Sequence, residues 1–168
     1  FSIELAGLQL KAGWHAVHLH LVRDSHVRAI GRVLVPSSRA RFGVVSDIDD
    51  TVVFTNVRNK LKMVLALALS NARTRKPFAG VTAFYQALHA GVNPFFYVSK
   101  SPWNLYAPLI KYLEVQGLPL GPLLLRDFGL RPEKEHKRKA IEEILTTYPK
   151  LKFILIGDSG ENDPEIYS

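Results

Sequence analysis

Between residues 42 and 156, short apolar runs alternate with longer segments whose apolar residues recur at helical spacing. The short runs are typical of buried strands, and segments with apolar residues three or four positions apart are typical of helices. Strands that alternate with helices predict an α/β fold with a mostly parallel sheet. We expect strands at 42–45, 95–98, 123–125 and 151–156, and helices at 59–70, 80–90, 101–116 and around Ala140, Ile141, Ile144 and Leu145.

The first 35 residues follow a different pattern: residues 15–21 alternate, with Val17, Leu19 and Leu21 on one face, and residues 31–35 read as a second strand that stops at Pro36. A period of two is typical of half-exposed strands. The chain therefore divides into a short β-rich lead-in over 1–35, compatible with being part of a preceding domain, and a main domain over 36–168. Within the main domain, we expect the third helix to begin with Ser101 as its N-cap and Pro102 in its first turn.

Composition limits the class of protein without selecting a function. Hydrophobic residues make up 47% and charged residues 22%, as in ordinary globular proteins, and no apolar run reaches the ~18 residues of a membrane span. The absence of cysteine excludes disulfides and thiolate sites. The net charge of +7, concentrated in 73–76 and 134–139, favours acidic partners such as nucleic acid, anionic lipid or phosphorylated substrates, unless both patches are simply solvated.

Polar side chains follow three of the predicted strands at the points where the strands end. Asp47 and Asp49 follow the first, Ser99 follows the second, and Asp158 follows the last. In open α/β sheets, ligands bind beyond the carboxyl ends of the strands, so these residues are expected to converge. Two carboxylates ~4 Å apart repel by about 4 kcal/mol near a protein surface, so such a cluster indicates a cation, catalysis, or carboxylates that simply point into water.

Four motifs in order give the chain a resemblance to the haloacid dehalogenase superfamily of phosphatases. They are DIDDT at the first strand end, Ser99 at the second, Lys137 near the start of the last helix, and GDSGENDPE after the last strand. The segments NPFFYVSKSPWNLY, GPLLLRDFG and LIGDSGENDPEIY resemble more closely the actin-patch-protein type of phosphatidate phosphatase catalytic domain, from about Gly31 to the end. This resemblance implies a Rossmann-like sheet with helices on both faces, a small helical cap insert, and a domain truncated at its C-terminus.

The resemblance also implies roles for the catalytic residues. Asp47 would attack phosphorus and form an aspartyl-phosphate. Asp49 would protonate the leaving group and later accept a proton from water. Ser99 would bond the phosphoryl oxygens, and Lys137 would balance negative charge. Lys134, three residues earlier on the same basic segment, competes with Lys137 for this role.

The cofactor implied by the resemblance is Mg²⁺, a hard cation that takes oxygen ligands and bridges carboxylates to phosphate. Asp47, Asp158 and the backbone carbonyl of Asp49 would be ligands. Asp163 would act as a further acidic partner in the same site.

The substrate implied by the resemblance is phosphatidate, which would be hydrolysed to diacylglycerol and phosphate by a cytoplasmic enzyme without a nucleic-acid partner. The spacing of the motifs, taken without the resemblance, supports only a Mg²⁺-dependent phosphomonoesterase. Three other interpretations stay open: a soluble phosphomonoester as substrate, a catalytically idle module that binds lipid or cytoskeleton, and a phosphotransferase. The predicted helix at 59–70, with basic neighbours, is either a core helix or a peripheral contact with anionic membrane.

Overall fold

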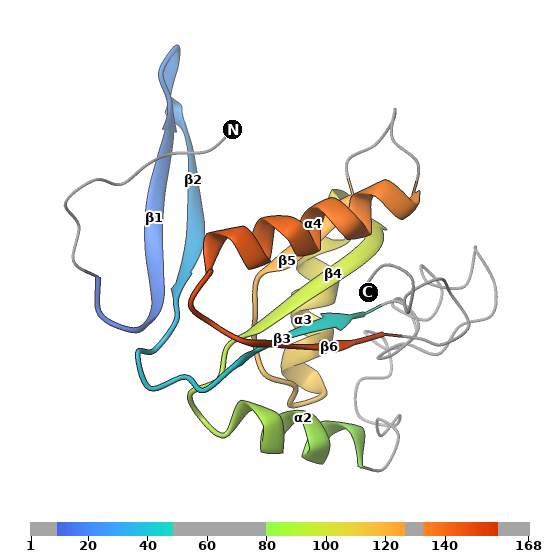
Figure 1. The fold of residues 1–168 in the computed structure, drawn as a ribbon. Helices are drawn as coiled ribbons and strands as arrows, with labels where there is room; N and C mark the ends of the chain where they lie inside the picture. The colour runs from blue at the N-terminus through green and yellow to red at the C-terminus, as the bar shows by residue number, and fades with distance from the viewer. Residues whose placement is uncertain (1–9, 49–79, 127–132, 158–168) are drawn as a thin grey trace.

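The computed structural model describes residues 10–48, 80–126 and 133–157. Within these ranges, six strands form two separate sheets, and the helices accompany the larger sheet (Figure 1). The strands are β1 (Gly13–Leu21), β2 (Asp24–Val35), β3 (Gly43–Asp47), β4 (Phe95–Pro102), β5 (Leu123–Arg126) and β6 (Phe153–Ile156). The helices are α2 (Val81–His89), the 3-10 helix η1 (Trp103–Leu105), α3 (Tyr106–Val115) and α4 (Glu133–Thr147).

The larger sheet contains four parallel strands in the order β5-β4-β3-β6. β3 lies between β4 and β6, with Asp47 opposite Val98 on one side and Ser46 opposite Ile156 on the other. Because the strands are parallel, their carboxyl ends lie at one edge. The prediction of an α/β fold with a parallel sheet is confirmed for the described residues.

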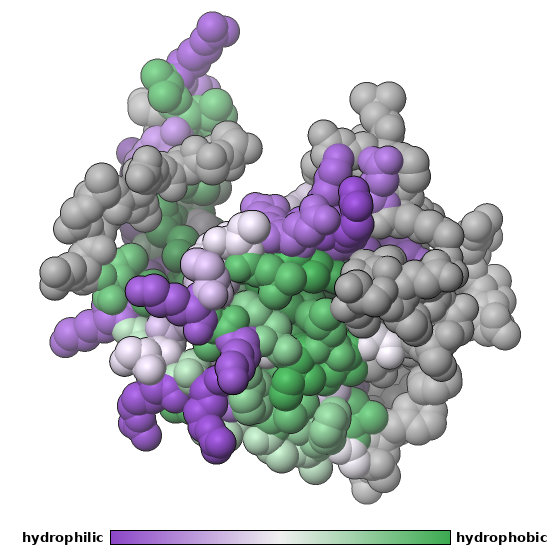
Figure 2. Space-filling model, viewed as in Figure 1, coloured by the Kyte–Doolittle hydropathy of each residue, from purple (hydrophilic) through white to green (hydrophobic). Residues whose placement is uncertain are grey.

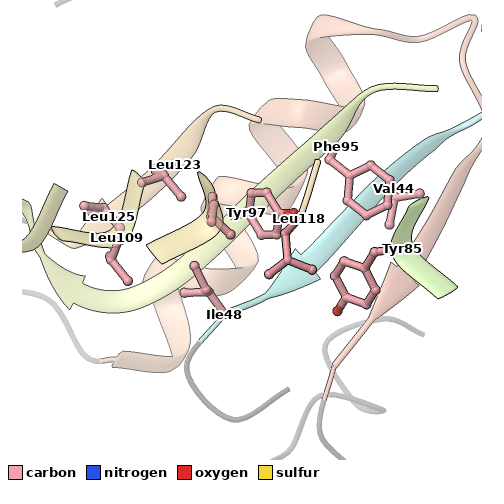
Figure 3. Close-up of a cluster of buried hydrophobic side chains, with 10 residues drawn as sticks. Val44, Ile48, Tyr85, Phe95, Tyr97, Leu109, Leu118, Leu123 and Leu125 are labelled. Atoms are coloured by element: carbon pink, nitrogen blue, oxygen red, sulfur yellow. The ribbon is translucent and has the colours of Figure 1, made fainter. Parts of the chain in front are cut away.

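Helices cover both faces of this sheet, because successive strand residues point to opposite sides. Val44 belongs to a core cluster with side chains of α2 and α3, whereas Val45 belongs to a cluster with side chains of α4. Figure 3 shows nine labelled members of the first cluster, to which β3, β4, β5 and both helices contribute. The odd and even positions of β3 therefore face different helices.

The predicted start of the third helix at Ser101 is wrong. Ser101 and Pro102 are the last residues of β4, and Pro102 still lies opposite Arg126 of β5. Proline lacks only the N–H, so the strand end tolerates it, and pairing with β5 overrides the local helix-start signal. The helical path begins at η1 and continues as α3.

The buried face of α4 differs by one residue from the predicted face. Ala140, Ile141 and Ile144 are buried against the sheet, but Leu145 is 40% exposed. The outward side of the helix is hydrophilic (Figure 2), where Arg138 pairs with Glu142 at 3.7 Å and Lys139 with Glu135 at 3.8 Å. Much of the basic segment 134–139 thus lies beside acidic residues one helical turn away.

The lead-in strands β1 and β2 form an antiparallel pair that stands beside the larger sheet (Figure 1). Both lead-in strands are confirmed, and β2 is longer than predicted. The domain limit at residue 35 stays a prediction, and the predicted helix at 59–70, together with most of the cap insert, lies outside the described residues. In the described part of the chain, no helix is long and apolar enough to cross a membrane.

Gly121 allows β5 to approach β4. A Cβ at this position would overlap the carbonyl oxygen of Phe95 and lie 2.7 Å from its carbonyl carbon. Both contacts are with backbone, which cannot move aside as a side chain can. Immediately after this glycine, Pro122 accepts a hydrogen bond of 2.8 Å from the Tyr97 amide.

We predict that Gly121→Ala lowers the free energy of unfolding by about 1–3 kcal/mol, the usual cost of overpacking a core position. The midpoint of urea unfolding, followed by circular dichroism, measures this change. Gly31→Ala is the matched control, because a Cβ there would meet its nearest atom at 3.5 Å. Equal midpoints for the two variants would contradict the prediction.

A candidate active site at the carboxyl edge of the sheet

Asp47 ends β3 as a buried carboxylate. Only 2% of the residue is exposed, and its Oδ2 accepts a hydrogen bond of 2.8 Å from Nζ of Lys137, which is also 2% exposed. The two residues are 90 positions apart in the sequence. The fold therefore joins the residues of the first and third motifs as one buried ion pair.

The position of Lys137 follows from the apolar stripe of α4. Lys137, Ala140, Ile141 and Ile144 are spaced by three, four and seven positions, which places them on one helix face. Asp47 has the same strand parity as Val45, whose side chain faces α4. The preceding His136 adds an anchor, since its Nε2 donates to the Leu124 carbonyl oxygen at 3.3 Å.

A buried ion pair of this kind constrains the fold more than it stabilises it. Two charges lose their hydration on burial, and their attraction compensates for the loss only when the geometry is good. Here Nζ and Oδ2 are at the short distance of a charge-assisted hydrogen bond. Removing either charge would leave the other buried without its counterion.

Ser99, the residue of the second motif, lies one position beyond Val98, the pairing partner of Asp47. It is completely buried, and its Oγ accepts a hydrogen bond of 2.9 Å from the Ser101 amide. The register of β4 and β5 is irregular between Val98 and Pro102, where the strand ends. The hydroxyl thus belongs to the same carboxyl edge as Asp47, as the sequence predicts.

Two further residues of this edge, Ser46 and Tyr85, were not predicted as site residues. Ser46 is completely buried, and its Oγ donates to the Asp47 carbonyl oxygen at 3.0 Å and lies 2.8 Å from the Tyr85 hydroxyl. Burial raises the pKa of Tyr85; its hydrogen bond with Ser46 lowers the pKa, and the Asp47 charge raises it. The only sequence signal is a serine within the apolar strand before Asp47. No pattern distinguishes Tyr85, which is buried, from Phe84, which is 53% exposed.

The other predicted site residues lie outside the described residues. They are Asp49, Asp158 and Asp163, together with the side chain of Lys134. The register of β6 places Ile156 opposite Ser46. Asp158 follows two residues later in the sequence. Over the described ranges, no three His, Asp or Glu side chains are grouped to hold a metal ion.

A cavity of about 560 Å³ opens at the opposite, amino edge of the sheet. Its walls come from residues 36–38, Ala40 and residues 147–151. The first group precedes β3, and the second consists of the end of α4 and the segment before β6. They are mainly apolar, and the charged group there is Lys150. The buried pair of Asp47 and Lys137 therefore lies at the other end of the strands.

The fold and the site define an α/β protein with a buried Asp–Lys pair where its central parallel strand ends. The sequence profile described as "Phosphatidate phosphatase APP1, catalytic domain" matches residues 42–168, which is most of the chain. The chain belongs to this family. The match begins at the residue before β3 and includes β3–β6 with all four motifs.

Two relatives extend the comparison. "Phosphatidate phosphatase APP1" of Saccharomyces cerevisiae is 35% identical over 135 residues, which cover 75% of this chain and 23% of that protein. An uncharacterised protein of Schizosaccharomyces pombe is 28% identical over 152 residues, which cover 86% of this chain and 25% of that protein. The chain thus spans about a quarter of the length of these relatives. The resemblance inferred from the motifs is confirmed.

We predict that Lys137→Met lowers the free energy of unfolding by about 3–5 kcal/mol, because Asp47 would stay buried without the ammonium group that binds it. Urea unfolding gives the value. Lys139→Met is the matched control on the same helix, where an exposed ion pair is worth ~0–1 kcal/mol.

The double variant Asp47→Asn/Lys137→Met should be less destabilised than the sum of the two single variants, since it removes both charges together. Equal urea midpoints for Lys137→Met and Lys139→Met would contradict the prediction that loss of the buried pair destabilises the fold.

Proposed function

We propose that the chain is the catalytic part of a Mg²⁺-dependent phosphatidate phosphatase that acts through an aspartyl-phosphate on Asp47. The observation that carries the proposal is the buried Asp47–Lys137 pair at the carboxyl edge of the sheet, in a chain of this family. The substrate is the one named for the family and for the yeast relative. The fold is of haloacid dehalogenase type, and α2, which belongs to the insert between β3 and β4, covers the sheet.

Asp47 is the nucleophile. One carboxylate oxygen forms a bond to phosphorus, and the bond between phosphorus and the ester oxygen breaks. Asp49 donates a proton to the departing alkoxide, which leaves as diacylglycerol. Water then attacks the phosphorus of the aspartyl-phosphate and gives its proton to Asp49, and the P–O bond to Asp47 breaks. Phosphate is released and both carboxyl groups return to their starting state.

Lys137 supplies a positive charge that is already in place. A carboxylate and a phosphate repel as they approach, and the ammonium group, 2.8 Å from the nucleophile, opposes that repulsion. Because the side chain is buried and bonded, it needs little reorganisation during the reaction. Ser99, fixed by its bond from Ser101, contributes a hydroxyl for the phosphoryl oxygens.

Asp47 fits a Mg²⁺ site in its chemistry. Its carboxylate is a hard oxygen ligand of the kind that Mg²⁺ prefers, and it has two oxygens, of which Oδ2 binds Lys137. The ligands would be Asp47, Asp158 and the Asp49 carbonyl, with Asp163 beside them. When bound, the ion adds the positive charge that this many carboxylates and a phosphate require.

A pair of exposed aromatic side chains supports a lipid substrate. β4 continues past Val98, the partner of Asp47, so η1 begins beyond the end of β3. There Trp103 is 48% and Tyr106 is 39% exposed, and their rings stack with centroids 6.0 Å apart. Trp and Tyr favour the headgroup region of bilayers. We assign this pair to peripheral contact with an anionic membrane by a cytoplasmic enzyme.

We predict that the chain releases phosphate from phosphatidate in mixed micelles only when Mg²⁺ is present, and that Asp47→Asn lowers kcat by at least about 10³-fold, as expected for loss of a nucleophile. A phosphate-release assay measures both effects. The protein should be tested in parallel on soluble phosphomonoesters. Turnover of soluble esters alone would contradict the lipid substrate. Full activity of Asp47→Asn would contradict the assignment of Asp47 as the nucleophile.

We predict that Trp103 enters the bilayer interface. The chain has two tryptophans, Trp14 and Trp103, so Trp14→Phe isolates the fluorescence of Trp103. Its emission should shift to the blue with phosphatidylcholine vesicles that contain phosphatidate, and less at high salt, because exposed charges are then screened. The reciprocal variant, Trp103→Phe, should show no shift. Emission from Trp103 that does not change at low salt would exclude membrane contact by this pair.

A further inference from the structure

The polypeptide at the end of β3 is held from both faces of the sheet. Asp47 points to the α4 face, where Lys137 binds its carboxylate. Ser46 has the parity of Val44 and points to the face covered by α2 and α3. Its Oγ donates to the Asp47 carbonyl oxygen and lies within hydrogen-bond distance of the Tyr85 hydroxyl.

The direction of these bonds follows from proton counting. A serine hydroxyl has one proton, and in Ser46 that proton bonds the Asp47 carbonyl at 3.0 Å. Tyr85 is then the donor in the 2.8 Å contact with Ser46. Its hydroxyl points away from Val44 and Phe95 in Figure 3, although the ring packs beside Phe95 with centroids 5.5 Å apart.

The chain of hydrogen bonds is deeply buried. Ser46 is 0% and Tyr85 is 1% exposed, so water does not substitute readily for either hydroxyl. Fully satisfied buried networks are rigid, and each of their bonds polarises the next. The network ends on the peptide group between Asp47 and Ile48, where the chain leaves the sheet.

We propose that Tyr85 is a positioning residue for Asp47, and that it acts through Ser46 by fixing the Asp47–Ile48 peptide. This inference rests on the proposed function, because it assigns Tyr85 to the alignment of the nucleophile with phosphorus. Displacement of a reacting group by ~1 Å costs up to about 100-fold in rate. Fixing this peptide restricts rotation of the Asp47 backbone, and so restricts where its carboxylate lies.

The first test is Tyr85→Phe in the full chain, which removes only the hydroxyl. We expect kcat on phosphatidate to fall about tenfold with KM changed less than about twofold, since substrate binding does not require this bond. Tyr97→Phe is the matched control. Tyr97 belongs to the same cluster, and its hydroxyl donates to the Pro119 carbonyl oxygen at 2.8 Å, away from Asp47. Its kcat should equal that of the wild type.

A second variant, Ser46→Ala, breaks the same path at its next member. If both hydroxyls act through one network, the double variant Ser46→Ala/Tyr85→Phe loses no more kcat than the worse single variant. Losses that multiply would overturn the inference, as would a kcat of Tyr85→Phe equal to that of Tyr97→Phe.

Amide exchange provides a readout that does not depend on activity. The Ile48 amide donates to the Val98 carbonyl oxygen at 3.3 Å, so its hydrogen exchange, followed by NMR, reports on the peptide that Ser46 holds. We expect exchange of this amide to be about tenfold faster in Tyr85→Phe than in Tyr97→Phe. Equal exchange rates would overturn the inference even if the wild type is active on phosphatidate and Asp47→Asn is not. A wild type inactive on every phosphomonoester would instead remove the proposed function.

Discussion

The buried ion pair between Asp47 and Lys137 is the constraint on which the docking of α4 and the geometry of the carboxyl edge depend. Both groups lose their hydration, so each requires the other at hydrogen-bond distance. That requirement fixes how α4 lies on the sheet, because one orientation of the helix must both bring Lys137 to Asp47 and bury the apolar stripe. Rotating the helix by one residue, or sliding it by one turn, would expose Ile141 or separate Lys137 from Asp47. The pair therefore selects one arrangement of helix and sheet.

Because side chains of β3 alternate between the two faces of the sheet, two adjacent residues contact different helices. Asp47 faces α4, and Ser46 faces the side of α2. A slip of one residue in the pairing of β3 would exchange the two faces, so the register of the sheet specifies the site as well as the core. Neighbouring positions on one strand thus connect helices that lie on opposite faces. The position of Asp47 is consequently sensitive to packing on either side.

Motifs and periodicity predicted the parallel sheet and the edge where Asp47 and Ser99 lie, because strands and their carboxyl ends are local features. They left Lys134 and Lys137 as alternatives, since residues three apart on a helix share a face and only tertiary docking selects one. The same limit explains Leu145, where one position of helix rotation separates buried from exposed. Ser101 shows a different limit: its helix-start signal was outweighed by strand pairing with β5.

A lysine and an aspartate on the apolar faces of a helix and a strand are a local exception to the pattern that folds the rest of the chain. Well-packed apolar residues of similar volume often replace such a pair without loss of stability. The pair is therefore not needed to form a core, and the core around it is already supplied by Val45, Val98 and Ile141. Exceptions of this kind are expected where a site requires charge in a dry, fixed position. The topology also indicates a site here, because the pair lies at the edge where open parallel sheets bind ligands.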